Sequence, residues 1–129
     1  MTHLFPIRVY YEDTDMAGIV YHANYLKFIE RARSDWVSQQ GLDQKALRER
    51  DGIVFVVRRI ECDYLGMAKF DDRLEVRTVV RSMTGVRLIM GQEVFRGESC
   101  VFRAEVTAVC VTTSGQPARL PAPLRQKLH

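Results

Sequence analysis

The stretch VYYEDTDMAGIVYHANYLKF, residues 9–28, changes its character halfway along its length. Its first residues continue an apolar, aromatic run that is typical of a strand, and its last residues open a helical pattern. We expect a short strand over 5–11 and a tight connection from it to the helix. That connection holds three acids, one glycine and one histidine, namely Glu12, Asp13, Asp15, Gly18 and His22.

Residues 23–40 are predicted to form one long amphipathic helix. Apolar side chains recur there at helical spacing, and polar side chains occupy the opposite side. Gly41 follows as a common C-terminal stop, and Asp43 opens a second, short helical piece over 43–50. The apolar positions of the long helix are Tyr25, Phe28, Ile29, Ala32 and Trp36.

After residue 58 the apolar period changes from the helical spacing to two, which is the spacing of strands with one buried face. Turn signals rich in glycine, serine and aspartate separate the segments. The tail over 120–129 is predicted to close with one helical turn. The predicted strands cover residues 59–64, 73–81, 86–96 and 100–110.

The order of strand, long helix and four strands predicts an α+β fold. Short connections make the later strands antiparallel neighbours, and their apolar face needs the helix to cover it. The edges of such a sheet stay open in a monomer. We therefore expect edge pairing or face packing between subunits.

The composition is that of an ordinary globular protein. The chain has 129 residues, which fits a single domain over 1–129, and its net charge of +3 suits anionic small molecules without arguing for nucleic acid. Three cysteines without a CxxC spacing favour neither disulfides nor zinc. With no signal peptide or membrane-spanning segment in the sequence, we expect a cytoplasmic protein.

Asp15 is the candidate for chemistry in the connection. The first N–H groups of a helix lack partners and can polarise a carbonyl oxygen, and a nearby carboxylate could then act on the carbonyl carbon. Gly18 would let the backbone approach a ligand closely. From spacing alone, the more common role of such acids is to stabilise a turn or a helix start.

His22 has two interpretations of its own. Its imidazole could act as a general base, or the residue could contribute only its backbone N–H. Spacing alone makes a structural role for the ring more common. The sequence contains no GxSxG motif and no phosphate-binding glycine loop, which leaves no supported serine nucleophile or nucleotide site.

The segment RVYYEDTDMAGIVYHANYLKFIERAR, residues 8–33, resembles the signature of the hotdog-fold acyl-CoA thioesterases. The resemblance is to the 4-hydroxybenzoyl-CoA thioesterase superfamily, and within it to the YbgC-type branch. The matched core runs from Thr14 to Tyr25. ECDYLGMAKFDDRLEVRT, residues 61–78, is similar to the family's next segment, with Met67 where the family often has proline.

The resemblance implies a curled antiparallel sheet of about five strands wrapped around one long helix. It implies a homodimer or homotetramer with a site at the subunit interface, with Asp15 as the catalytic carboxylate, His22 as a backbone donor and Gly18 beside them. Acyl-CoA would be the substrate, arginine and lysine side chains would meet its phosphates, and no metal or redox cofactor would take part. A link to the Tol–Pal cell-envelope system is also implied.

Three alternatives remain open at this point. The same fold could carry an acyl-CoA hydratase or dehydratase, with Asp15 and His22 as an acid–base pair. The chain could also bind acyl-CoA without catalysis. In the third alternative the acid is Glu30 on the helix, although its position on the polar side argues for Asp15 instead.

Overall fold

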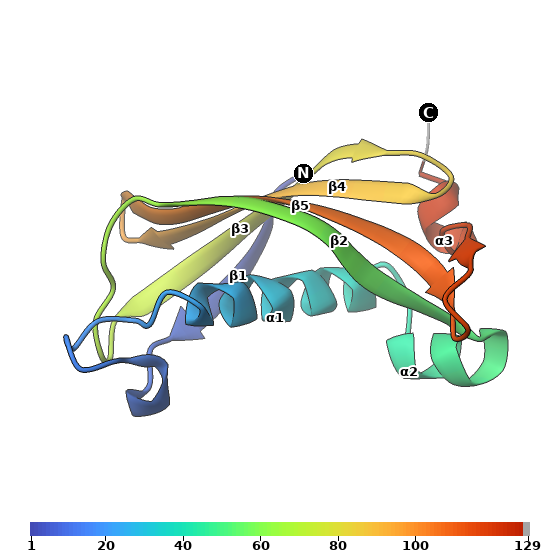
Figure 1. Ribbon diagram of the computed structural model, residues 1–129. Coiled ribbons are helices and arrows are strands. Elements are labelled where there is room, and N and C mark those ends of the chain that lie inside the picture. The colour runs from blue at the N-terminus through green and yellow to red at the C-terminus, as the bar shows by residue number, and fades with distance from the viewer. Residues whose placement is uncertain (128–129) are drawn as a thin grey trace.

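A curled antiparallel sheet forms the larger part of the fold in the computed structural model, which describes residues 1–127 (Figure 1). Its strands lie in the spatial order β1-β3-β4-β5-β2, and the short β6 pairs with β5. All these pairings are antiparallel, as the sequence predicts. The strands are β1 (His3–Arg8), β2 (Ile53–Tyr64), β3 (Arg73–Met83), β4 (Arg87–Arg96), β5 (Ser99–Thr112) and β6 (Pro117–Ala118).

Helix α1 (Asn24–Gln39) lies against one face of the sheet, as Figure 1 shows. Phe28, Ile29 and Ala32 are fully buried and pack against strand side chains that include Val76 and Phe102. The burial of a whole helical stripe confirms the helix predicted over 23–40, because the apolar period in the sequence matches the buried face.

The C-terminal end of α1 is covered by two short helical segments. Asp43 caps α2 (Gln44–Ala46) by accepting hydrogen bonds from the N–H groups of Lys45 and Ala46, and a single π-helical turn follows over Leu47–Asp51. Near the C-terminus, α3 (Ala122–Arg125) buries Leu124 in a second apolar cluster. This segment confirms the predicted helical turn; residues 128–129 of that tail lie outside the described part.

The predicted first strand over 5–11 is corrected at both ends. Strand β1 begins earlier and ends at Arg8, and Tyr11 lies in a 3-10 helix, η1 (Tyr11–Asp13). The strand preference of the two tyrosines is overridden because the Asp13 carboxylate accepts a 2.8 Å hydrogen bond from the Tyr10 N–H and bends the chain. The expected tight strand-to-helix connection is therefore wrong, and residues 9–23 form a folded loop instead.

Strand β2 is longer than the predicted 59–64, since it begins at Ile53. The run Ile53–Val57 is apolar without alternation, so the period of two is absent there. A β-bulge between Val57 and Arg59 shifts the register against β5, and a bulge of this kind moves side chains to the other face. The alternation that the sequence shows starts only beyond the bulge.

The outer edge of β2 is open within residues 1–127, where β2 pairs only with β5. On this strand Val56 is 38% exposed and Val57 is 44% exposed. Exposed apolar residues on an open edge are typical of a surface that another strand covers. No helix in the described part of the chain is long and apolar enough to cross a membrane.

Candidate active site

The loop between β1 and α1 folds into a small hairpin with Asp15 near its tip. Thr14 and Val20 form an isolated antiparallel bridge, and the Asp15 N–H donates to the carbonyl of Ile19 at 3.0 Å. The Gly18 N–H returns to the carbonyl of Asp15 at 2.9 Å. Gly18 has a φ of +80°, which an L-residue adopts only with strain, so the turn itself requires glycine.

Asp13 holds this loop to the start of α1. Its carboxylate binds the Tyr10 N–H, and its carbonyl accepts from the Tyr21 N–H at 2.9 Å and from the Asn24 side-chain amide at 3.0 Å. Asp13 is only 5% exposed. These contacts confirm the predicted turn-supporting role of Asp13, and the neighbouring Glu12 is exposed on the same 3-10 helix.

A single cleft of about 470 Å³ brings Asp15 and His22 together, although the two residues are far apart on the loop. Its opposite wall comes from the connection that follows β2, some forty positions later in the chain. In the sequence, Asp15 lies well before Asn24, the first residue of α1. The hairpin folds the chain back, so that Asp15 lines the same cleft as His22. The lining residues are Asp15, Ile19, Val20, His22, Tyr25, Tyr64, Leu65, Gly66 and Met67.

The Asp15 carboxylate is exposed and has one of its oxygens free. Oδ1 accepts a 2.9 Å hydrogen bond from the N–H of Ala17, two residues later, which fixes the side chain within its own turn. Within residues 1–127, Oδ2 accepts no hydrogen bond from the protein. A carboxylate that is oriented on one side and free on the other can act on a bound molecule.

His22 presents a backbone donor at the start of α1. The N–H groups of His22 and Ala23 donate to no carbonyl of the described chain, whereas the adjacent Asn24 N–H donates to Tyr21. Free N–H groups before the first turn carry the partial positive charge of the helix. The His22 ring is exposed and lies 4.5 Å from the ring of Tyr21, and no acid partner in residues 1–127 holds it in a catalytic tautomer.

Gly18 is not among the described residues that line the cleft. A Cβ atom added to it would meet no atom within 4 Å, so nothing in the described chain approaches it closely. Its position is explained by the turn conformation. Gly18 therefore shapes the hairpin that carries Asp15, and a direct contact between Gly18 and a ligand stays a prediction.

Glu30, the alternative acid, lies elsewhere on α1. It is exposed, accepts a 2.8 Å hydrogen bond from the Ser34 hydroxyl and lines a different cavity of about 250 Å³ beside β2. Within one chain this cavity contains neither Asp15 nor His22. The structure thus groups Asp15 with His22 and separates both from Glu30.

The sequence did not predict the aromatic side of the cleft, which Tyr25 and Tyr64 form. The Tyr25 ring stacks on Phe102 at 4.9 Å, and the Tyr64 ring meets Phe102 edge-on at 5.1 Å. Burial raises the pKa of Tyr25, and a hydrogen bond to the backbone of Ala68 partly offsets it. The available signal was the similarity of residues 61–78 to a family segment, which marked the region without assigning a role to Tyr64.

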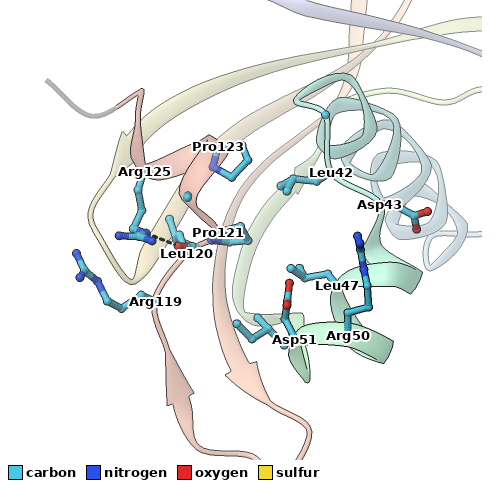
Figure 2. A pocket seen from close by; sticks show the side chains of 13 residues that line it. Leu42, Asp43, Leu47, Arg50, Asp51, Arg119, Leu120, Pro121, Pro123 and Arg125 are labelled. Atoms are coloured by element: carbon cyan, nitrogen blue, oxygen red, sulfur yellow. Dashed lines mark hydrogen bonds between the residues drawn. The ribbon is translucent and has the colours of Figure 1, made fainter.

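A third cavity, of about 450 Å³, lies at the end of α1 opposite the Asp15 cleft (Figure 2). It separates the turn after α1 from the C-terminal segment, with Leu42, Leu47 and Pro121 on its walls and Arg119 and Arg50 on its two sides. None of the predicted site residues lines it. The cleft that holds both Asp15 and His22 is therefore the candidate active site.

The Asp15 cleft holds the kinds of group that acyl transfer uses. A free carboxylate oxygen can attack a carbonyl carbon or remove a proton from water, and an unpaired backbone N–H can stabilise the charge on the carbonyl oxygen. The two residues that carry these groups, Asp15 and His22, line the same cleft. No second nucleophile is required for that reaction.

Comparison with known proteins agrees with this chemistry. Residues 9–128 match the family model of the thioesterase-like superfamily. The chain is 38% identical over 126 residues to an acyl-CoA thioesterase YbgC of Haemophilus influenzae, covering 97% of this chain and 93% of that protein. It is 43% identical over 108 residues to an acyl-CoA thioester hydrolase YbgC of Escherichia coli, covering 83% and 80%.

Among solved structures, a probable thioesterase from Bartonella henselae superposes with a TM-score of 0.90 at 37% identity. The match covers 94% of this chain and 100% of the other. The similarities in sequence and in fold thus agree with one another. The chain belongs to the thioesterase-like superfamily, as a hotdog-fold member of the YbgC type.

Proposed function

We propose that the protein hydrolyses acyl-CoA thioesters to a free acid and coenzyme A, with Asp15 as its catalytic residue. The observation that carries this proposal is the shared cleft, which is lined both by Asp15, whose Oδ2 accepts no hydrogen bond from residues 1–127, and by His22, whose N–H has no partner there. The names of the YbgC relatives supply the substrate class.

The reaction suits a site with a single carboxylate. A thiol has a pKa of about 8.5, judged from cysteine, so coenzyme A leaves as a thiolate with little help from a general acid. The His22 N–H would bind the thioester oxygen, on which negative charge develops as the carbon becomes tetrahedral. This interaction strengthens in the transition state and therefore accelerates the chemical step.

Asp15 has two routes to the same products. In the first, its carboxylate bonds to the thioester carbon, the C–S bond breaks, and water hydrolyses the resulting anhydride. In the second, Asp15 takes a proton from a water molecule, whose oxygen then bonds to the carbon as the C–S bond breaks. One turnover in H₂¹⁸O identifies the first route if water attacks the Asp15 carbonyl carbon of the anhydride, because only then does the Asp15 carboxylate gain the label.

A panel of short, long and aromatic acyl-CoAs, followed by the release of free thiol, tests the proposal. Hydrolysis predicts one free thiol for each acyl-CoA consumed. Loss of enoyl absorbance without thiol release would identify a hydratase, and saturable binding without turnover would identify a binding protein. Either of those two results would overturn the proposed hydrolysis.

We also propose that the active protein is a homo-oligomer joined through β2. The open edge of this strand and the exposed Val56 and Val57 support such an interface. Basic side chains brought together there would meet the CoA phosphates. In a dimer or a tetramer of this kind, the Asp15 clefts of two subunits would lie near the interface formed by their β2 strands.

We further propose a cellular setting for the protein, supported by family membership and by the cysteines. Cys62, Cys100 and Cys110 are all free thiols, which supports the cytoplasm as the compartment. Membership of the YbgC type carries the further proposal of a link to the Tol–Pal system. Co-purification of the tagged protein with Tol–Pal components from its own host tests that link.

A further inference from the structure

Tyr64 stands at the end of β2, inside the cleft, with its ring held by other aromatic side chains. The ring centroid lies 5.1 Å from Phe102, 5.9 Å from Tyr25 and 6.1 Å from His22, each in an edge-on or tilted arrangement. Aromatic pairs at such separations favour a defined ring position. The phenol is therefore directed by packing, although the side chain borders solvent.

The Tyr64 hydroxyl donates a 2.9 Å hydrogen bond to the backbone carbonyl of His22. This bond spans 42 positions in the sequence and ties the end of β2 to the start of α1. Burial, with the nearby Cys62 thiol, raises the pKa of the Tyr64 phenol above its ordinary 10.0. The phenol consequently keeps its proton, and its role as a donor, through the neutral range.

Three other hydrogen bonds hold the backbone around His22. The Tyr21 N–H donates to the carbonyl of Asp13 at 2.9 Å, and the Tyr21 carbonyl accepts from the Asn24 N–H at 2.8 Å. The Asn24 amide also binds the carbonyl of Asp13. The Tyr21 carbonyl shares a planar peptide with the His22 N–H, so the bond from Asn24 fixes the direction of that N–H and strengthens it as a donor.

With the Tyr64 bond included, the carbonyls on both sides of the His22 Cα atom are anchored, and the His22 N–H between them is left without a partner in residues 1–127. We propose that Tyr64 is a positioning residue: it holds the oxygen of the His22–Ala23 peptide, the peptide that follows the His22 Cα atom, and so keeps the chain at His22 in the conformation in which the His22 N–H meets the thioester oxygen of bound acyl-CoA. This inference rests on the proposed function and adds a residue to it.

The substitution Tyr64→Phe removes the hydroxyl and keeps the ring. We expect kcat to fall about tenfold with KM nearly unchanged, because the donor remains present but loses its fixed orientation. The matched control is Tyr11→Phe, since Tyr11 is 81% exposed and outside the cleft. This control should keep the wild-type kcat and KM.

A spectroscopic measurement separates positioning from a general structural effect. In an Asp15→Asn background, which retains the substrate, the infrared stretch of a ¹³C-labelled thioester carbonyl reports the hydrogen bond to its oxygen. Adding Tyr64→Phe should move that stretch toward its value in free acyl-CoA. An unchanged stretch and an unchanged kcat would overturn the inference.

Replacing Tyr64 with 4-aminophenylalanine keeps a donor at the same ring position and tests rescue if the phenylalanine variant is unstable. Its kcat should return to within about threefold of wild type, since a neutral N–H replaces the O–H. Failure of this variant together with a correct fold by circular dichroism would also count against the inference. A wild-type protein that releases no thiol would instead refute the proposed function itself.

Discussion

The carboxylate of Asp15 accepts a 2.9 Å hydrogen bond from the backbone N–H of Ala17, within the same turn. Its orientation is therefore set locally, by the hairpin, and not by a distant cation or a second acid. The hairpin depends in turn on the left-handed backbone of Gly18, at a φ of +80°. The geometry of the carboxylate and the conformation of one glycine are thus linked.

Gly18→Ala should lower both stability and activity. A Cβ atom at this φ costs about 1–2 kcal/mol, although no atom lies within 4 Å to clash with it. Gly115→Ala is the matched control, because Gly115 has a φ of +89° and equally open surroundings but lies outside the cleft. Urea unfolding and thiol-release kinetics measure the two effects.

The expected result is a similar loss of unfolding free energy in both glycine variants, with a lower kcat/KM only for Gly18→Ala. An equal loss of activity in Gly115→Ala, under conditions where both proteins are folded, would show that activity follows global stability. The proposed link between the hairpin and Asp15 would then be wrong.

Gln92→Leu should destabilise the contact between α1 and the sheet. Gln92 is fully buried, donates to the Ile29 carbonyl at 2.9 Å and to the Thr78 hydroxyl at 3.0 Å, and accepts from Arg33 at 3.0 Å. Burial lowers the pKa of Arg33, which marks its guanidinium as desolvated. Removing its partner should cost about 1–3 kcal/mol in urea unfolding.

The double variant Arg33→Met with Gln92→Leu provides the control. It removes the desolvated cation together with its partner, so its loss of unfolding free energy should be smaller than the sum of the two single losses. Strict additivity of the three measurements would contradict a coupled network at this position.

Stability should also depend on pH through Cys110. Burial raises the pKa of this thiol from 9.0 to about 11, so the folded state resists ionisation that the unfolded state allows. Its stabilising contribution is complete below pH 9 and is lost as the pH rises toward 11. Two pKa units correspond to about 3 kcal/mol, an upper value for the loss.

Unfolding free energies of wild type and Cys110→Ala at pH 7, 9 and 10.5 measure this contribution. Other groups titrate in both proteins, so the difference between them isolates Cys110. We expect that difference to shrink as the pH rises. A difference that stays constant from pH 7 to pH 10.5 would show that the thiol ionises equally in both states.

Val57→Lys should prevent association through the edge of β2. Val57 is 44% exposed there, and a lysine on an open edge strand discourages pairing. We expect self-association to weaken at least about tenfold, or about 1.4 kcal/mol, by sedimentation. Val86→Lys is the control, since Val86 is 51% exposed in the turn between β3 and β4.

If both lysine variants keep the wild-type mass in solution, the subunits do not meet at β2. If only Val57→Lys becomes monomeric and also loses thiol release, the interface and the active site depend on each other. The activity of a fully monomeric variant therefore separates a shared site from a site that is complete within one chain.

The sequence predicted elements whose residues repeat at a regular period. The burial of Phe28, Ile29 and Ala32 follows the helical spacing, and the antiparallel strands follow the period of two. The prediction was wrong where a single side chain changes the direction of the backbone. The Asp13 carboxylate accepts a hydrogen bond from the Tyr10 N–H and so ends the strand that Tyr10 and Tyr11 favour. A contact of this kind produces no repeating pattern in the sequence.

The candidate site was predicted in part for a similar reason. Asp15, Gly18 and His22 belong to one continuous motif, which the resemblance could identify. Tyr64 reaches the same cleft only because β2 returns across the sheet to the start of α1. No local pattern encodes a contact between residues 42 positions apart, so this residue required the structure.

The most direct measurement is the single-turnover rate of thiol release by Asp15→Asn with a good acyl-CoA substrate, beside Glu30→Gln as the control acid. Loss of the carboxylate should slow release at least about a hundredfold, whereas Glu30→Gln should keep the wild-type rate. Circular dichroism confirms that both variants are folded. Thiol release at the wild-type rate by Asp15→Asn would contradict a catalytic role for this carboxylate.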